Sequence, residues 1–96
     1  MGQVADRNRD NIINSAVKCY ANGKTTIREI AEEAGLPKAN IHYYYKSANK
    51  LYSACLNHAK AIPTENRSDE QVALIAMDYI KNREFYSAAR ALLKQN

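Results

Sequence analysis

Apolar residues recur along the chain at the spacing of an α-helix. Between Arg7 and Tyr20 they fall at i, i+3, i+4 and i+7, so that they share one helix face. The pair Asn22-Gly23 then interrupts the pattern, and glycine readily adopts the left-handed conformation that closes a helix. The pattern therefore predicts a first helix from about Arg7 to Tyr20. Its apolar residues are Ile12, Ile13, Ala16, Val17 and Tyr20.

Two short helices follow, joined by a tight turn. Thr26 and Glu29 form a Thr-x-x-Glu capping box, which marks a helix start, and Gly35 marks the end of that helix. Pro37 suits the first turn of the next helix, which we expect to reach Tyr45. Two short helices around a turn form the outline of a helix-turn-helix, although an ordinary helical hairpin has the same outline. The apolar stripe of the second helix is Ile27, Ile30, Ala31 and Ala34.

The remaining sequence is also predicted to be helical. Ser47 can cap a fourth, longer helix, which Pro63 ends, and residues 63–68 have the composition of a linker. Ser68 or Asp69 can then cap a further helix. We find no strand pattern and no internal repeat.

The apolar stripe after this linker changes phase. Its first part is Val72, Ile75, Ala76, Tyr79 and Ile80, and its second part is Phe85, Ala88, Ala89, Leu92 and Leu93. The shift falls at residues 81–83 and predicts a kink or a new helix capped by Asn82. The predicted fold is all-α. It comprises a three-helix helix-turn-helix domain at 1–46, a longer connector helix at 47–62, the linker at 63–68, and one or two further helices in a partial C-terminal region at 69–96.

The third predicted helix has an outward face unlike that of an ordinary soluble helix. Ile41 and Tyr45 lie four residues apart and can dock this helix on the core. Exposed helix positions normally carry Glu, Lys or Ala, whereas here amide, imidazole and phenol groups suit phosphates and base edges. Ala39 is small and would let the helix approach a groove closely. The face predicts contact with nucleic acid, and its other members are Lys38, Asn40, His42, Tyr43 and Tyr44.

The net charge is concentrated in the same part of the chain. The 96 residues, 46% of them hydrophobic and 25% charged, are typical of one small globular domain. Residues 1–60 contain nine Lys or Arg and five Asp or Glu, whereas residues 61–96 contain five of each. The whole net charge of +4 therefore lies in the first part, which favours an anionic partner.

The sequence carries no recognisable catalytic or metal-binding pattern. Cys19 and Cys55 are too few for a disulfide scaffold or a four-cysteine zinc site. We expect both to be small buried residues, with a redox switch as the alternative. His42 and His58 are expected on different helices, with His58 in the core or at its boundary. We therefore expect no enzyme activity, no metal and no cofactor. Because no secretory signal or apolar run of membrane length is found, we expect a cytoplasmic protein.

The residues from Thr25 to Leu36 resemble the first half of the DNA-binding domain of TetR-family transcriptional regulators. Residues 38–45 are similar to the recognition helix of that domain, and residues 47–52 are similar to the start of its long connector helix. The resemblance covers about residues 7–60 and implies an N-terminal DNA-binding domain, followed here by a short, truncated C-terminal part. One departure is Pro37, which stands where the family usually has a capping Ser or Thr.

The resemblance also implies a role for each residue of the outward face. The helix at 38–45 would enter the major groove, where Asn40 and His42 would face base edges. Lys38 and Ala39 would lie near the start of that helix. Contacts with the phosphate backbone would come from Thr26, Tyr43, Tyr44 and Lys46.

The partners that the resemblance implies are double-stranded DNA and a second copy of the chain. A homodimer would bind an inverted-repeat operator, most often to repress transcription. Only 28 residues follow the linker, too few to enclose a drug-sized effector, so we expect the effector site to be absent from this chain. A second interpretation stays open: a helical protein-interaction or dimerisation module, in which residues 72–93 bind a partner and the basic surface is incidental.

Overall fold

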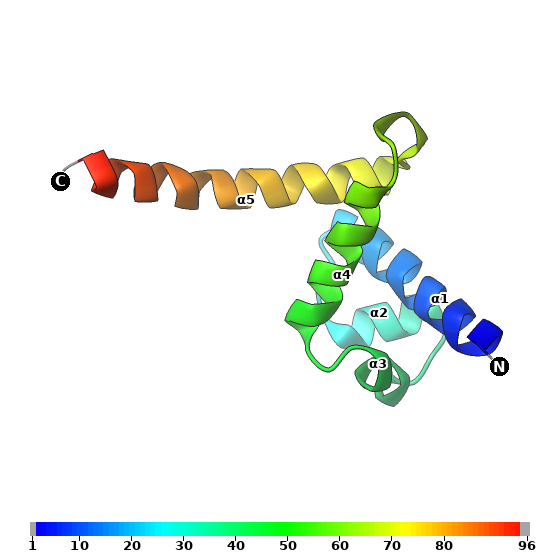
Figure 1. Cartoon of the computed structure of the whole chain (residues 1–96). Helices are drawn as coiled ribbons and strands as arrows, with labels where there is room; N and C mark the ends of the chain where they lie inside the picture. Colours follow the sequence, from blue (N-terminus) through cyan, green and yellow to red (C-terminus); the bar gives the residue numbers. More distant parts are fainter. Residues whose placement is uncertain (1, 95–96) are drawn as a thin grey trace.

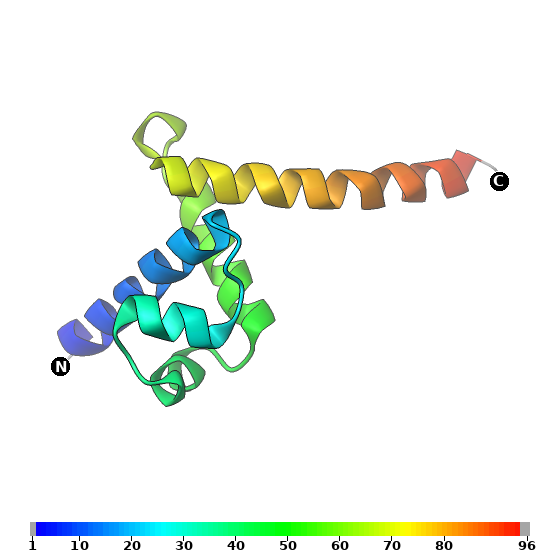
Figure 2. The same ribbon diagram turned by 180° about the vertical axis from the view of Figure 1, so that it is seen from behind.

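The computed structural model describes the backbone of residues 2–94 and the side chains of residues 7–83 and 87–94. These residues form helices and no strand, which confirms the predicted all-α fold. The four helices α1 to α4 pack into one bundle, and the long helix α5 crosses one end of it and projects beyond (Figure 1, Figure 2). The elements are α1 (Gly2–Ala21), α2 (Ile27–Ala34), α3 (Lys38–Tyr44), α4 (Ala48–Ala61), the 3-10 helix η1 (Thr64–Asn66) and α5 (Asp69–Lys94).

Helix α2 begins and ends at the capping residues that the sequence indicates. The Thr26 hydroxyl accepts a hydrogen bond from the Glu29 backbone N–H at 3.1 Å, and the Thr26 backbone N–H donates to the Glu29 carboxylate at 3.3 Å. At the other end Gly35 has a φ of 69°, in the left-handed region, and its N–H donates to the carbonyls of Ala31 and Glu32. This tight ending lets α3 start after a short turn, as a helix-turn-helix requires.

The two following helices start differently. Pro37 occupies the N-cap position of α3 without a side-chain hydrogen bond, so α3 begins one residue later than expected. The Ser47 hydroxyl accepts from the Lys50 backbone N–H at 3.1 Å and caps α4, as predicted. Between them, the Tyr45 backbone N–H donates to the Ile41 carbonyl at 2.8 Å and ends α3.

The hydrophobic core lies among α1 to α4, and each of these helices contributes a side chain that is fully buried. These anchors are Ile12 from α1, Ile30 from α2, Ile41 from α3 and Leu51 from α4. Leu74 extends the same core to α5. Burial of one such side chain contributes about 1.5–3 kcal/mol, so the placement of α3 depends on this shared core.

Helix α5 is continuous over Asp69–Lys94, so the kink or new helix predicted at residue 82 is wrong. Asn82 does not cap a helix, because its amide donates to Asp78 Oδ2 at 3.1 Å, one turn earlier in α5. The first part of α5 packs on the bundle through Leu74 and Asp78, whereas the second part projects past it (Figure 1). Apolar residues of the projecting part, such as Leu93, remain exposed.

Three expectations about individual residues are also corrected or limited. Tyr79, a member of the first apolar stripe after the linker, is 67% exposed because α5 turns the side that carries Leu74 toward the bundle. His58 is exposed and not in the core, since the buried line of α4 runs through other positions. The side chain of Phe85 lies outside the described residues.

Candidate nucleic-acid interface

Helix α3 contacts the core on one side and solvent on the other. Ile41 is 0% exposed, and Tyr44 and Tyr45 are half-buried beside it, packed against the core cluster. Docking by Ile41 and Tyr45 is therefore as predicted. The outward residues differ in exposure: Lys38, Ala39 and His42 are exposed, Asn40 is half-buried, and Tyr43 is 72% exposed.

Tyr43 is held in place although it is exposed. Its ring meets that of Tyr44 edge-to-face, with the ring centroids 5.1 Å apart, and Lys46 Nζ lies 5.6 Å from the Tyr43 centroid. Aromatic pairs and cation–π contacts of this kind each contribute about 0.5–1.5 kcal/mol. A phenol hydroxyl and an ammonium group are therefore presented together at the end of α3.

Tyr44 is oriented by the first helix. The Asn8 amide Nδ2 donates to the Tyr44 hydroxyl at 3.3 Å, and the guanidinium carbon of Arg9 lies 5.7 Å from the Tyr44 ring centroid. Sequence reasoning missed Asn8 and Arg9 as members of this surface. No signal in the sequence pointed to them, because the first ten residues contain two arginines and two aspartates, whose side-chain charges cancel.

Thr26 lies at the start of α2 and is exposed, but its hydroxyl is already engaged. It donates to Glu29 Oε1 at 2.7 Å while accepting from the Glu29 backbone N–H. The Thr26 hydroxyl and backbone hold the pKa of the Glu29 carboxyl below its usual value, so this group is ionised at neutral pH. For Thr26 to donate to a phosphate, its hydroxyl would have to leave this carboxylate.

The surface around α3 is rich in uncompensated lysines. The sequence has no Asp or Glu between Glu33 and Glu65, and Lys38, Lys46 and Lys50 are exposed there. The ion pairs found among the described side chains lie elsewhere, where α2 carboxylates pair with Lys18 and Arg28. The lysines on and after α3 therefore favour an anionic partner.

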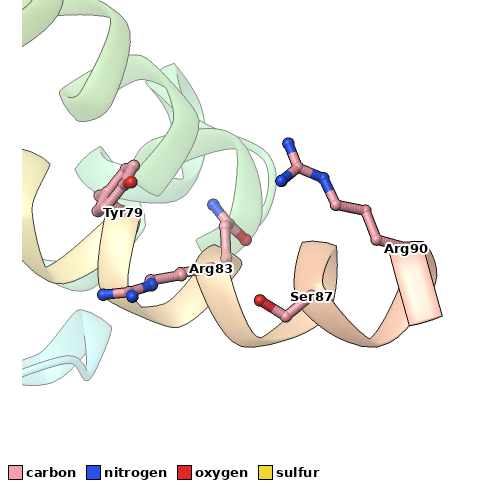
Figure 3. Close-up of a pocket in the computed structure, with 5 residues that line it drawn as sticks. Tyr79, Arg83, Ser87 and Arg90 are labelled. Carbon is pink, nitrogen blue, oxygen red and sulfur yellow. The ribbon is translucent and has the colours of Figure 1, made fainter.

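Of the hollows along α5, two are large, and both lie away from α3. One, of about 360 Å³, is lined by residues of α5 alone; Figure 3 shows Tyr79, Arg83, Ser87 and Arg90, which line it together with Asn82. The other, of about 430 Å³, is mostly apolar and is lined by Thr64, Arg67, Val72, Ile75, Ala76, Tyr79 and Ile80. Both are surfaces of one long helix and its preceding turn, and neither is a cavity enclosed between several helices.

The cysteines have no catalytic setting. Both are buried, as predicted, and burial raises the pKa of the Cys55 thiol to about 12, so this side chain stays in the unreactive thiol form. Burial also raises the pKa of Cys19. Among the described side chains, no three His, Cys, Asp or Glu gather as they would around a metal ion. None of the helices within residues 2–94 has the length and hydrophobicity of a membrane span.

Comparison with known proteins agrees with the resemblance to TetR-family regulators. Residues 12–55, which run from α1 into α4, match the model of the family described as bacterial regulatory proteins, tetR family. The chain is also 33% identical over 99 aligned residues to the HTH-type transcriptional repressor NicS of Pseudomonas putida. That alignment covers 86% of this chain and 47% of NicS, so the chain spans about half the length of the curated relative it matches. No solved structure matches the chain.

Proposed function

This chain belongs to the TetR family of bacterial regulatory proteins, and from that membership we propose that it binds duplex DNA sequence-specifically, with α3 in the major groove. As a member of this family the protein is a DNA-binding regulator. The observation that carries the proposal is the outward face of α3. Ile41 fixes one side of this helix in the core, and the opposite side presents Tyr43 beside Lys46 within a segment free of carboxylates.

The proposed roles follow from exposure and chemistry. Asn40 and His42 would read base edges, since an amide can bond bidentately to adenine and an imidazole can donate or accept. Lys38 and Ala39 would lie close to the DNA at the start of α3. Phosphate contacts would come from Tyr43, Tyr44, Lys46 and, once its hydroxyl leaves Glu29, Thr26.

Repression and a two-fold symmetric operator form the next part of the proposal. The relative that matches this chain is named a transcriptional repressor, and repression is the outcome we propose here. A homodimer would present two copies of α3 to an inverted repeat. Exposed apolar residues on α5, including Val72, Ile80 and Leu92, favour such an association. Because its DNA target lies with the bacterial chromosome, the protein would act in the cytoplasm.

We further propose that the chain is organised as a DNA-binding domain at 1–46, a connector helix at 47–62, a linker at 63–68 and a partial helical region at 69–96. Both hollows on α5 would need additional helices to enclose a ligand, so the effector site would not be complete within this chain. No catalytic step is proposed for the protein.

Selection of binding sites from a random duplex pool tests the proposal. Enrichment of an inverted repeat is the expected result. Enrichment of a single half-site would support recognition by α3 but would contradict binding as a dimer. The alternative function is a protein-interaction module, which the exposed apolar residues of α5 favour. If no duplex is retained at low salt, DNA binding is refuted and the interaction module takes its place.

A further inference from the structure

We propose that the start of α1 belongs to the DNA-contacting surface, with Arg9 as a phosphate contact and Asn8 as the positioning residue of the Tyr44 hydroxyl. This inference rests on the proposed DNA binding and deepens it. Asn8 and Arg9 lie outside the helix-turn-helix, yet both reach Tyr44 at the end of α3. The N-terminal half of α1 and helix α3 both lie at the end of the bundle away from α5 (Figure 1, Figure 2).

The first observation is a row of alternating cations and aromatic rings. Arg9 lies 5.7 Å from the Tyr44 centroid, Tyr44 lies 5.1 Å from Tyr43, and Lys46 lies 5.6 Å from Tyr43. This cation–aromatic row, Arg9–Tyr44–Tyr43–Lys46, runs from α1 across the end of α3 to the following loop. Its two cations stand at the ends and its two phenols between them, which are the donor groups that a phosphate backbone recruits.

The second observation concerns the single proton of the Tyr44 hydroxyl. A phenol oxygen carries one proton and can also accept hydrogen bonds. The Asn8 amide donates to this oxygen, so the hydrogen bond between the two residues does not engage the Tyr44 hydroxyl proton. The Tyr44 ring packs against the core and against Tyr43, so its hydroxyl oxygen is held in position. Asn8 therefore leaves the phenol proton available for an external acceptor such as a phosphate oxygen.

The third observation is the position of Arg9. Its side chain is exposed, and its planar guanidinium suits bidentate bonding to phosphate. The carboxylate of Asp10, the next residue of α1, is also exposed and offsets part of this charge. Together with Lys46 at the other end, Arg9 keeps the cation–aromatic row positive.

A double-mutant cycle tests the role of Asn8. The probe is a labelled duplex carrying the selected site, or a random-sequence duplex if selection yields none, with affinity measured by fluorescence anisotropy. Asn8→Ala should weaken binding about twofold to tenfold, the effect of one neutral hydrogen bond. In a Tyr44→Phe background, Asn8→Ala should have no further effect. Asn8→Asp should weaken binding more than Asn8→Ala, because a carboxylate accepts the phenol proton and turns it inward.

The matched control for this cycle is Asn14→Ala, which removes an exposed asparagine from the same helix and should leave affinity unchanged. Thermal unfolding of each variant shows whether it is folded, and midpoints should stay close to wild type because Asn8 is only half-buried. Additive losses in the cycle, or an Asn8→Asp variant that binds like wild type, would overturn the positioning role.

A salt series tests Arg9. Loss of one phosphate contact should reduce the slope of log affinity against log salt by about 0.9. Arg9→Ala should show this reduction, Arg9→Lys should restore the slope, and the control Arg83→Ala on α5 should not change it. If Tyr43→Ala and Lys46→Ala weaken binding while the Arg9 and Asn8 variants do not, this inference fails and the proposed function stands. If the wild-type chain binds no duplex, both fail.

Discussion

The Tyr52 hydroxyl donates a hydrogen bond of 2.8 Å to the Asp78 carboxylate, and this contact joins α4 to α5. Asp78 is only 8% exposed, and its other oxygen accepts from Asn82 at 3.1 Å. The Tyr52 ring packs edge-to-face on Tyr20 of α1, with centroids 5.2 Å apart. The pair therefore fixes where α5 lies on the bundle of α1 to α4, since a buried carboxylate has few alternative partners.

Tyr52→Phe should lower the free energy of unfolding by about 1–3 kcal/mol, because it keeps the ring but deprives a buried carboxylate of a donor. Urea unfolding followed by circular dichroism measures this loss. Tyr79→Phe is the matched control, because Tyr79 lies on α5 with 67% of its surface exposed and should tolerate the same chemical change. Equal unfolding midpoints for Tyr52→Phe and wild type would show that the Tyr52–Asp78 bond does not hold α5.

The same tyrosine predicts a loss of stability at alkaline pH. Burial, followed by the hydrogen bond to Asp78, raises the pKa of Tyr52 from 10.0 to about 12, and burial raises that of Tyr20 to about 12. The folded state thus retains these protons where the unfolded state releases them. Their contribution is complete below pH 10 and is lost as pH rises toward 12. Between pH 10 and 12 the free energy of unfolding of Tyr52→Phe should fall less steeply than that of wild type. Parallel curves of this free energy against pH would contradict the role given to Tyr52.

Gly35→Ala should destabilise the turn between α2 and α3. Gly35 has a φ of 69°, and a Cβ placed there would meet no atom within 4 Å, so the cost is the backbone conformation alone. That cost is about 1–2 kcal/mol for a residue with a Cβ, and asparagine tolerates the left-handed region better than alanine does. Thermal or urea unfolding should therefore rank the proteins wild type, Gly35→Asn, Gly35→Ala. An alanine variant as stable as wild type would mean that this turn is not left-handed in solution.

Arg67→Ala should loosen the junction between α4 and α5. Arg67 Nε donates to the carbonyl oxygens of Ala59 at 3.0 Å and Ile62 at 2.9 Å, and a second guanidinium nitrogen donates to the Lys60 carbonyl at 3.1 Å. These carbonyls lie at the end of α4, where a helix runs out of N–H donors, although the Ala59 carbonyl also accepts from the Ile62 backbone N–H at 3.2 Å. Arg67→Ala should therefore lower the free energy of unfolding by about 1–3 kcal/mol. Arg83→Ala, which removes an exposed arginine from α5, should be close to neutral, and similar values for both variants would count against the capping role.

The fold was largely predictable because local signals determine it. Helix ends are marked locally by the Thr26–Glu29 capping box, by Gly35 and by the Ser47 cap. The position of Ile41 indicates which side of α3 is buried. The resemblance to the TetR family, recognised over about residues 7–60, was likewise confirmed by the family model that matches residues 12–55.

Tertiary packing decided what the sequence did not predict. The exposure of Tyr79 depends on how α5 rotates against the bundle, and the apolar spacing of α5 alone allows more than one face. Asn82 could have capped a helix, but the buried carboxylate of Asp78 offered its amide a partner within α5. Contact between Asn8 and Tyr44 joins residues 36 positions apart, a separation at which sequence periodicity carries no information.

The most direct test of DNA binding through α3 compares Tyr43→Ala with Tyr79→Ala. Both tyrosines are largely exposed, at 72% and 67%, but only Tyr43 lies on α3. Duplex affinity is measured for both variants and for wild type over a series of salt concentrations. Tyr43→Ala should weaken binding to all sequences by about tenfold or more, the effect of a hydrogen bond to a charged phosphate, whereas Tyr79→Ala should match wild type. Wild-type affinity should fall steeply with salt. Equal affinities for the two variants, or wild-type binding that salt does not weaken, would contradict recognition of DNA by α3.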